Sequence, residues 1–373
     1  MNEDRASRYH RRKRQASIGG VVWSVVLLVL LPASGASTVM RDAAEALCVR
    51  LAPAAWQPSL SVFVYVVMLS AVNEAGSLPL NFYSGYILEH RYELSTETVR
   101  GWLLDQLKAF GLGTALGCGA AGVIYSFIRR SPDHWWLWAG CTFALLIIGL
   151  TNLAPVLLLP LFYPVKPLDR DVLRSRLLTL AERAGARVVG AYEMGFAGKT
   201  RKANAALAGI GTTRRILVSD TMLAEYSDDE IEVVLAHEMA HHVHGDIWKG
   251  IVFESGLILA GFYCSARLLR QFSSAIGLRS IDDPAGLPLL LLAAGAVSVV
   301  MMPVGHAISR TFERSADRFA LRMTRNPSAF VSAMRRLAAQ NLAEDHPSKI
   351  IQWLFYSHPP IRERIAAAES FKV

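Results

Sequence analysis

Long apolar runs alternate with charged stretches along this chain, and their lengths predict a membrane protein. A helix needs about 20 mostly apolar residues to cross about 30 Å of hydrocarbon. Six windows meet or approach this length, at residues 18–36, 60–88, 107–128, 134–162, 249–270 and 285–306. We therefore predict a polytopic helical membrane protein that is mainly α in fold class.

Three of these windows need separate interpretation. Glu74 lies in the second window and Glu254 in the fifth. A carboxylate that faces lipid is costly, so we expect both to face the bundle interior or an aqueous cavity, unless they lie near enough to an interface to reach water. The first window follows a run of basic residues and ends in "PASGAS". This pattern fits a retained helix, which we favour, and also a cleaved signal peptide.

The distribution of basic residues predicts the orientation of the chain. The windows divide it into a basic tail, a membrane domain of about four spans and a second domain interrupted by the last two spans, at residues 1–17, 18–164 and 165–373. By the positive-inside rule the basic tail lies in the cytoplasm. Alternation through six spans then places the polar stretches 165–247 and 307–373, and both termini, on the cytoplasmic side.

Composition agrees with a membrane protein and excludes other classes. Of the 373 residues, 52% are hydrophobic and 19% are charged, which is too apolar for an ordinary soluble enzyme or a disordered chain. The net charge of +8 lies in the polar segments, and no basic helix is interleaved with aromatic residues, so we expect no nucleic-acid partner. The four cysteines show no C-x-x-C spacing, which argues against a thiolate zinc site.

The first polar stretch predicts two helices separated by a small sheet. Apolar residues recur at helical spacing from Pro167 to Gly185. The segments "RVVGAYEMGF", "ANAALAGI" and "RRILVSD" are typical of short strands, the last two joined by a turn after Ile210, and they predict a small antiparallel sheet. A helix then begins near Ser227, whose hydroxyl can cap it, with three acidic residues in its first turn.

That second helix carries the pattern H-E-x-x-H. His237 and His241 stand four residues apart and share one face of the helix, where two imidazoles can bind one zinc ion. Glu238 lies one step round the helix and can reach the attacking water. His242 and His244 crowd the same turn, but zinc sites rarely take four helical histidines. We therefore expect these two to be outer or surface residues near the membrane.

A catalytic zinc also needs a third protein ligand and an open position. The best candidate is Glu313 in "SRTFERSADRFA", which follows the sixth window. Asp317 stands four residues further along, where it could accept the ring N–H of a ligand histidine and fix its tautomer. Taken alone this segment is an ordinary charged helix. Beside H-E-x-x-H it predicts one Zn²⁺ per chain, with Arg310 among the outer contacts.

These motifs resemble those of the type I CAAX prenyl proteases, a family of gluzincin membrane proteases. The resemblance rests on "HEMAH" followed two spans later by "SRTFERSAD", on "KANAALAGIGTTRRILVSDTML" upstream and on "SHPPIRERI" near the C-terminus. The segment "LPLNFYSGYILEHRYELSTETVRGWLLDQLK" resembles the N-terminal membrane domain of the prenyl protease branch. Together these segments cover most of the chain from about Leu78 onward, and they imply a gluzincin-type metalloprotease domain around the small sheet.

The resemblance implies a role for each motif residue. It makes His237, His241 and Glu313 the zinc ligands, Glu238 the general base and Asp317 an outer carboxylate. The expected reaction is zinc-assisted peptide hydrolysis, in which the metal polarises the scissile carbonyl and Glu238 takes the proton of water. The edge strand at residues 204–210 could hold the substrate backbone by strand addition.

Two further residues gain a role only through the resemblance. Asn204 and His358 would lie beside the scissile carbonyl, where they could bind substrate or stabilise its oxyanion. From the residues alone, Asn204 is a turn or edge-strand residue and His358 a loop residue before Pro359. Members of the family usually have seven spans around a large intramembrane chamber, whereas this chain has six windows. A long window could contain a bend, or the first helix could be missing. The six windows therefore do not establish a closed chamber.

The expected function is that of a membrane zinc metalloendopeptidase at the cytoplasmic membrane face. Its expected partners are the lipid bilayer and a peptide or membrane-protein substrate, with or without a prenyl group. The resemblance implies trimming of C-terminal prenylated peptides. A related alternative is a heat-shock quality-control protease that degrades misfolded membrane proteins, and a remote one is a non-catalytic membrane scaffold or transporter.

Overall fold

Each of the six apolar windows forms a helix in the computed structural model, which describes residues 4–153, 157–209 and 214–372. These helices are α1 (Arg5–Ala33), α3 (Gln57–Phe82), α5 (Val99–Arg130), α6 (Trp135–Leu153), α11 (Asp246–Phe272) and α12 (Leu287–Thr324). Among the described residues, five helical segments are long and apolar enough to cross a membrane, and the apolar part of α6, Trp135–Thr151, is shorter. The prediction of a mainly α, polytopic membrane protein is confirmed.

The bundle also contains segments that the windows did not predict. A further helix, α2 (Ala36–Leu51), follows the first window and packs against α3. The second window continues from α3 through a π-helical turn, η1 (Tyr83–Ile87), into α4 (Leu88–Arg91), and the fourth window contains the short α7 (Leu159–Phe162) after α6. The long windows therefore form several joined segments instead of single uninterrupted helices.

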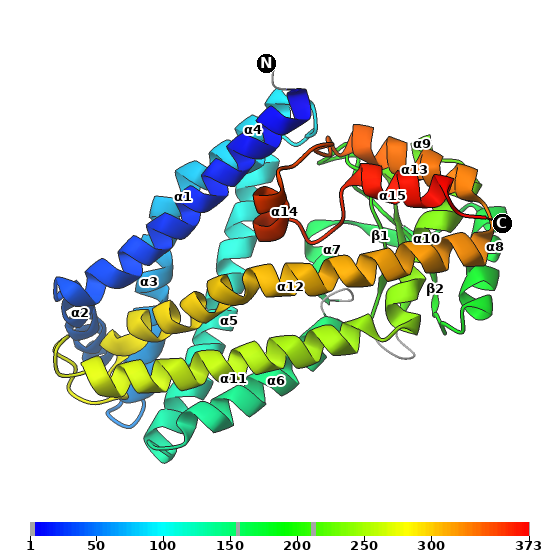
Figure 1. The fold of residues 1–373 in the computed structure, drawn as a ribbon. Coiled ribbons are helices and arrows are strands. Elements are labelled where there is room, and N and C mark those ends of the chain that lie inside the picture. The colour runs from blue at the N-terminus through cyan, green and yellow to red at the C-terminus, as the bar shows by residue number, and fades with distance from the viewer. Residues whose placement is uncertain (1–3, 154–156, 210–213, 373) are drawn as a thin grey trace.

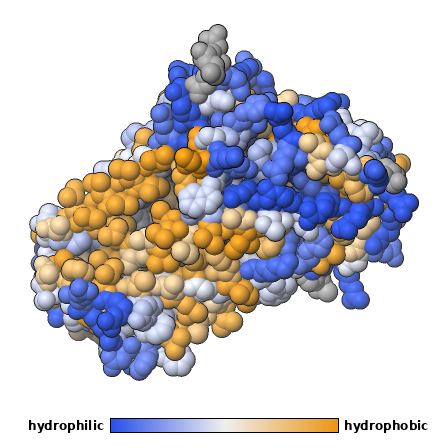
Figure 2. Space-filling model, viewed as in Figure 1, coloured by the Kyte–Doolittle hydropathy of each residue, from blue (hydrophilic) through white to orange (hydrophobic). Residues whose placement is uncertain are grey.

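Apolar side chains cover the outside of the bundle. Figure 2 shows a broad hydrophobic region over the long helices on one side of the molecule and hydrophilic residues over the other end. Large apolar residues of α1 such as Val25 and Leu30 are exposed there. Apolar surface of this extent is expected to contact lipid.

The two carboxylates of the spans lie in different surroundings. Glu74 accepts a hydrogen bond of 2.6 Å from Gln106 on the neighbouring α5, so it faces the bundle, as expected. Glu254 is exposed on α11. It lies eight residues after the start of that helix at Asp246, which is about 12 Å at 1.5 Å per residue. This position fits the alternative of a charge that reaches water near the interface.

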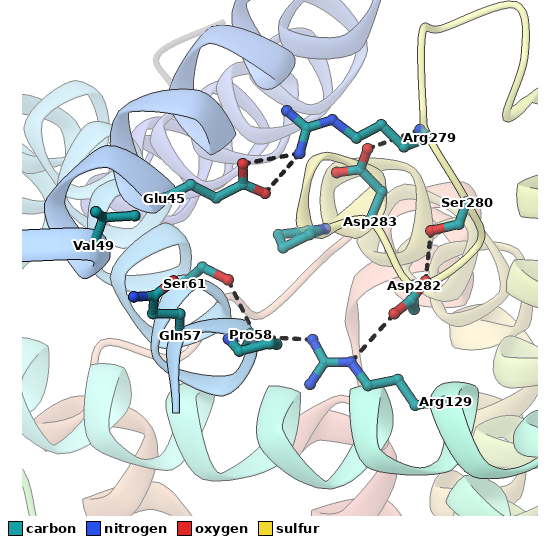
Figure 3. Close-up of a pocket in the computed structure, with 11 residues that line it drawn as sticks. Glu45, Val49, Gln57, Pro58, Ser61, Arg129, Arg279, Ser280, Asp282 and Asp283 are labelled. Atoms are coloured by element: carbon teal, nitrogen blue, oxygen red, sulfur yellow. Dashed lines mark hydrogen bonds and ion pairs between the residues drawn. The ribbon is translucent and has the colours of Figure 1, made fainter. Parts of the chain in front are cut away.

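Ion pairs join α2, α5 and the loop before α12 at one end of the bundle (Figure 3). Arg41 and Asp283 are both buried, with Nη1 2.6 Å from Oδ2. Arg279 bonds both oxygens of Glu45, and Arg129 pairs with Asp282 at 3.2 Å. Breaking one partner of a buried ion pair leaves an uncompensated charge, which is strongly destabilising. These contacts therefore hold the end of the bundle that lies away from the sheet (Figure 1).

The sheet is mixed, so the prediction of a purely antiparallel sheet is wrong in this respect. Its strands are β1 (Val165–Pro167), β2 (Gly190–Met194), β3 (Ala205–Ala208) and β4 (Arg215–Ser219), in the order β1-β2-β4-β3. Strands β3 and β4 pair antiparallel, as do β1 and β2, but β4 inserts beside β2 and runs parallel to it. The predicted turn after Ile210 lies outside the described residues. β3 and β1 are the two edge strands.

Helices pack around this sheet and form with it a hydrophobic core that is separate from the core of the bundle. They are α8 (Asp171–Arg183), α9 (Asp220–Glu225), α10 (Asp228–Val243), α13 (Pro327–Gln340) and α15 (Ile361–Glu369), whereas α14 (Lys349–Phe355) packs against α12. The predicted cap of α10 is present, because Ser227 Oγ accepts from the backbone of Glu230 while the Glu230 side chain accepts from that of Ser227. Fully buried residues such as Ile216, Leu235 and Phe330 form the core.

Helix α12 connects the bundle to this core. It has 38 residues, about 57 Å at 1.5 Å per residue, and its C-terminal part packs against α10 (Figure 1). The basic residues expected as a tail form the first turns of α1. From there Arg14 reaches Glu344 at 2.7 Å and His10 reaches the Leu342 carbonyl at 2.8 Å, both in the segment after α13. These contacts join α1 to the segment that follows α13.

Candidate metal centre

Two helices bring the three predicted ligands together. His237 and His241 lie on α10 and Glu313 on α12, and one possible ligand atom of each lies within 4.8 Å of the others. His237 Nε2 is 3.2 Å from Glu313 Oε2, and His241 Nε2 is 3.3 Å from Glu313 Oε1. The two imidazole rings stand almost perpendicular, at 85°. Both rings therefore present the same nitrogen to one carboxylate.

The other nitrogen of each ring is held by a second carboxylate. His237 Nδ1 lies 2.9 Å from Asp317 Oδ1, and His241 Nδ1 lies 3.1 Å from Asp246 Oδ2. Since a carboxylate accepts, each Nδ1 donates its N–H, and each Nε2 is left to face Glu313, where it can hold either a proton or a metal ion. This is the arrangement in which metal-binding histidines are usually oriented.

The facing atoms favour a positive charge between them. The Nε2 atoms of His237 and His241 lie 3.2 and 3.3 Å from the two oxygens of Glu313. Glu313 Oε2 is buried, and no hydrogen bond satisfies it among the described residues. Burial lowers the pKa of His237, but Asp317 and Glu313 outweigh it and raise the pKa to about 9. The centre therefore favours positive charge, and two imidazoles with a carboxylate match the donor set of a catalytic zinc.

Asp246 is a functional residue that the sequence pattern did not identify. It is the first residue of α11 and is buried. Gly245, with φ of +68°, allows the chain to turn sharply between α10 and α11 and return Asp246 to His241. The only sequence signal for this contact is the Gly-Asp pair directly after the histidine-rich turn.

Arg364 is a second residue that the sequence pattern missed. From α15 its guanidinium donates two hydrogen bonds to Asp317, from Nη2 to Oδ1 at 2.6 Å and from Nε to Oδ2 at 2.9 Å. Both residues are buried. A bidentate arginine fixes both the orientation and the ionisation of a carboxylate. Arg364 thus holds Asp317 in the position from which it orients His237.

Arg310 was expected among the outer contacts of the metal ligands, and its side chain lies elsewhere. Its Nη1 donates to the Tyr356 carbonyl at 2.6 Å and to the Gln352 carbonyl at 3.2 Å. The reason is geometric, because Arg310 precedes Glu313 by almost one helical turn and faces α14. Arg310 fixes the segment that leads to His358.

The structure places His358 beside the centre and Asn204 at the start of the edge strand. His358 Nε2 lies 3.4 Å from Glu313 Oε1, and Ser357 bonds its other ring nitrogen at 2.8 Å. Asn204 pairs through its backbone with Ser219, directly before β3. Only His358 therefore contacts the ligand group, whereas Asn204 lines a cleft at the beginning of β3.

The remaining histidines of α10 do not join the three ligand atoms. His242 Nε2 bonds the Leu207 carbonyl at 2.8 Å and so fastens the edge strand β3 to the helix. His244 contacts Ser315 at 3.3 Å and packs edge-on against Phe319. These contacts lie outside the group of three ligand atoms.

Glu238 lies beside the ligands without being one of the three grouped atoms. It is half-buried, and burial raises its pKa more than the neighbouring His237 and His241 lower it. A raised pKa brings a carboxylate nearer to the value suited to a general base at neutral pH. The site therefore combines a cation-binding group with an adjacent base, which is the equipment for hydrolysis by an activated water.

Comparisons with known proteins agree with this chemistry. Residues 167–372 match the description "Peptidase family M48", and residues 2–164 match "CAAX prenyl protease N-terminal, five membrane helices". An uncharacterized metalloprotease of Bacillus subtilis is 33% identical over 309 residues, which are 82% of this chain and 72% of that protein. The CAAX prenyl protease 1 of Saccharomyces cerevisiae is 26% identical over 336 residues, with 82% and 71% covered.

A solved structure supports the same fold. The crystal structure of S. mikatae Ste24p matches with a TM-score of 0.84 and 23% sequence identity, covering 97% of this chain and 87% of that one. The two family matches follow one another along the chain: the first covers α1 to α7, and the second covers the sheet region together with α11 and α12. The chain therefore belongs to peptidase family M48 and is a multi-pass membrane metallopeptidase.

Proposed function

We propose that this metallopeptidase uses zinc and cleaves prenylated peptides near their C-terminus, at the cytoplasmic membrane face. The observation that carries the proposal is the group of two Nε2 atoms and one carboxylate that face one another beside Glu238. The substrate class is supported by the relatives named CAAX prenyl protease 1 and by the matching N-terminal membrane region. In a C-a-a-X sequence three residues follow the modified cysteine, so cleavage after the cysteine releases a tripeptide.

The side chains of the centre have distinct roles in this mechanism. Zinc held by His237, His241 and Glu313 would supply polarisation of the scissile carbonyl and a lower pKa for the attacking water. Glu238 accepts the proton of that water and then delivers it to the leaving amine nitrogen. His358 lies where an N–H donor could stabilise the developing oxyanion.

The chain around the centre positions substrate. The free edge of β3 can pair with an extended peptide, which aligns the scissile bond along α10. Asn204 stands at the beginning of this edge and can bind the peptide backbone. The ion pairs behind the histidines, from Asp317 and Asp246, keep both rings fixed through the reaction.

Cleavage of three substrates by the purified, zinc-loaded full-length protein tests this proposal. The substrates are a farnesylated C-a-a-X peptide, its unprenylated twin and a misfolded membrane protein, with the cut bonds identified by mass spectrometry. We expect the farnesylated peptide to lose its last three residues fastest. Cleavage of the misfolded protein alone would favour a quality-control protease, and cleavage of none of them would favour a non-catalytic scaffold.

The same proposal places the centre and both termini on the cytoplasmic side. The basic residues of the first helical turns and of the sheet region support this orientation. In a background without native cysteines, we expect Arg174→Cys and Glu369→Cys to label only from the cytoplasmic side and Arg50→Cys only from the other. All three residues are exposed. Labelling of Arg174→Cys and Glu369→Cys from opposite sides would contradict the proposed topology.

A further inference from the structure

A polar cleft of about 620 Å³ lies between the membrane bundle and the sheet, at the beginning of the edge strand. The bundle contributes three carboxylates and the segment before β3 contributes two lysines and Asn204; these residues are Glu89, Glu97, Asp105, Lys199, Lys202 and Asn204. Tyr163 and Phe196 form an aromatic side of the cleft, with ring centroids 4.6 Å apart. Apart from Asn204, the proposed hydrolysis does not use these groups.

The free edge of β3 leads into this cleft. Ser219 donates its backbone N–H to the Asn204 carbonyl, so alternation turns the backbone groups of Ala206 towards β4 and those of Ala205 and Leu207 outwards. The outward carbonyl of Leu207 is bonded by His242 of α10. A peptide paired with this edge would therefore lie beside the metal-binding helix at Leu207 and reach the cleft at Asn204.

The cleft is closed beyond that point. Segment 94–96 of the bundle pairs with segment 199–201, through hydrogen bonds of 3.1 Å from Thr96 N to Lys199 O and 3.0 Å from Arg201 N to Leu94 O. The side chain of Asn341 bonds both the N–H and the carbonyl of Ala203. An extended peptide cannot continue along this occupied backbone, so its end must lie in the cleft.

The cleft lining has three carboxylates and two lysines, and two further lysines outside it, Lys13 and Lys108, bring the count to four ammonium groups for three carboxylates. Lys202 and Lys13 both bond Glu89, at 2.8 and 2.5 Å. Lys199 and Lys108 both bond Asp105. Each carboxylate thus holds two ammonium groups, of which Lys199 and Lys202 line the cleft.

Glu97 offsets part of this positive charge and can itself contribute to anion binding. It lines the cleft, and its Oε1 is buried with no hydrogen-bond partner among the described residues. Burial raises the pKa of Glu97, although Lys199 opposes this effect. When protonated, Glu97 becomes a hydrogen-bond donor to an incoming anion.

We propose that this cleft binds the free C-terminal carboxylate of the substrate through Lys199 and Lys202 and so sets the length of the released peptide. The proposal rests on the proposed peptidase function. Leu207 and Asn204 are three residues apart, which is about 10 Å at 3.3 Å per strand residue. A three-residue tail spans the same distance, if the substrate runs antiparallel to β3 with its C-terminus towards the cleft.

The test compares two farnesylated peptides that differ only at the last group, one with a carboxylate and one with a carboxamide. With wild-type protein in detergent, we expect kcat/KM to be on the order of ten- to a hundredfold higher for the carboxylate, mainly through KM, as charge-assisted hydrogen bonds typically provide. In Lys199→Gln this preference should fall to a few-fold at most. Peptides with one or three additional residues after the cut should also be poor substrates of the wild type.

Lys108→Gln is the matched control. Lys108 and Lys199 are both partners of Asp105, but only Lys199 lines the cleft. The control should keep most of the wild-type preference for the carboxylate, because it leaves both lysines of the cleft lining in place. Equal cleavage of the two peptides by the wild type would overturn the carboxylate site while leaving the peptidase function intact. Equal losses on both peptides in Lys199→Gln would also overturn it, because they would indicate a structural role.

Discussion

Replacement of Glu238 by glutamine is expected to lower peptide hydrolysis by about two to four orders of magnitude, the range typical of a lost general base. The zinc content should not change. The side chains of neighbouring helical residues diverge by about 100°, so Glu238 is directed away from the line of His237 and His241. Glutamine keeps the size of the side chain and removes its ability to accept a proton.

Metal analysis and single-turnover cleavage on one preparation measure both parts of this expectation. Glu232→Gln is a suitable control, because Glu232 is on the same helix but pairs with Arg176, at 3.1 Å from its Nε, away from the centre. The control should cleave at the wild-type rate. Near wild-type cleavage by zinc-loaded Glu238→Gln would remove Glu238 from the mechanism.

Glu313→Ala is expected to remove zinc and activity together. The substitution deletes one of three ligands and leaves the two imidazoles without the carboxylate that faces them both. Outer-contact substitutions typically weaken metal binding by about ten- to a hundredfold, so Asp317→Asn should fall in that range and Glu313→Ala should lose more. The described ion pairs of Glu313 are with His237, His241 and His358 of the centre itself, so its loss should not unfold the chain.

The measurement is zinc per folded protein by elemental analysis, with helicity by circular dichroism as the folding check. Glu363→Ala provides the control, because Glu363 is an exposed glutamate on the adjacent α15 that pairs with Arg314. Its zinc content should equal that of the wild type. Full zinc occupancy in a folded Glu313→Ala protein would show that the third ligand lies elsewhere.

Local sequence signals were sufficient for the helices and for the ligand set that the structure brings together. Apolar runs located all six long helices, because a span is defined by its own composition. Ser227 marked the start of α10 through a cap that involves only residues within one turn. The i, i+4 spacing of His237 and His241 placed both rings on one face for the same reason.

Features that depend on long-range packing could not be predicted in this way. The parallel pairing of β2 and β4 arises because β4 inserts between strands that precede it, which no single segment encodes. Asp246 and Arg364 reach the histidines only through the turn at Gly245 and the packing of α15 on α12. Arg310 shows the converse, since its proximity to Glu313 in sequence did not place it at the metal ligands.

The basic residues at the start of the chain have a second role that their charge pattern concealed. The sequence interpretation used them as a signal for orientation. In the structure Lys13 and Arg14 also bond Glu89 of α4 and Glu344 of the segment after α13, which joins α1 to both of these segments. A basic residue can determine membrane orientation and also bind other segments of the chain, and the second role is visible only in the three-dimensional structure.

X-ray absorption at the zinc edge of the active, zinc-loaded wild-type protein tests the central claim most directly. The account predicts a first shell of nitrogen and oxygen only, at about 2.0–2.2 Å, with outer-shell scattering from two imidazoles. In Glu313→Ala this signal should be lost with the metal. Sulfur scattering at about 2.3 Å would indicate a cysteine ligand, and it would contradict a centre made of His237, His241 and Glu313.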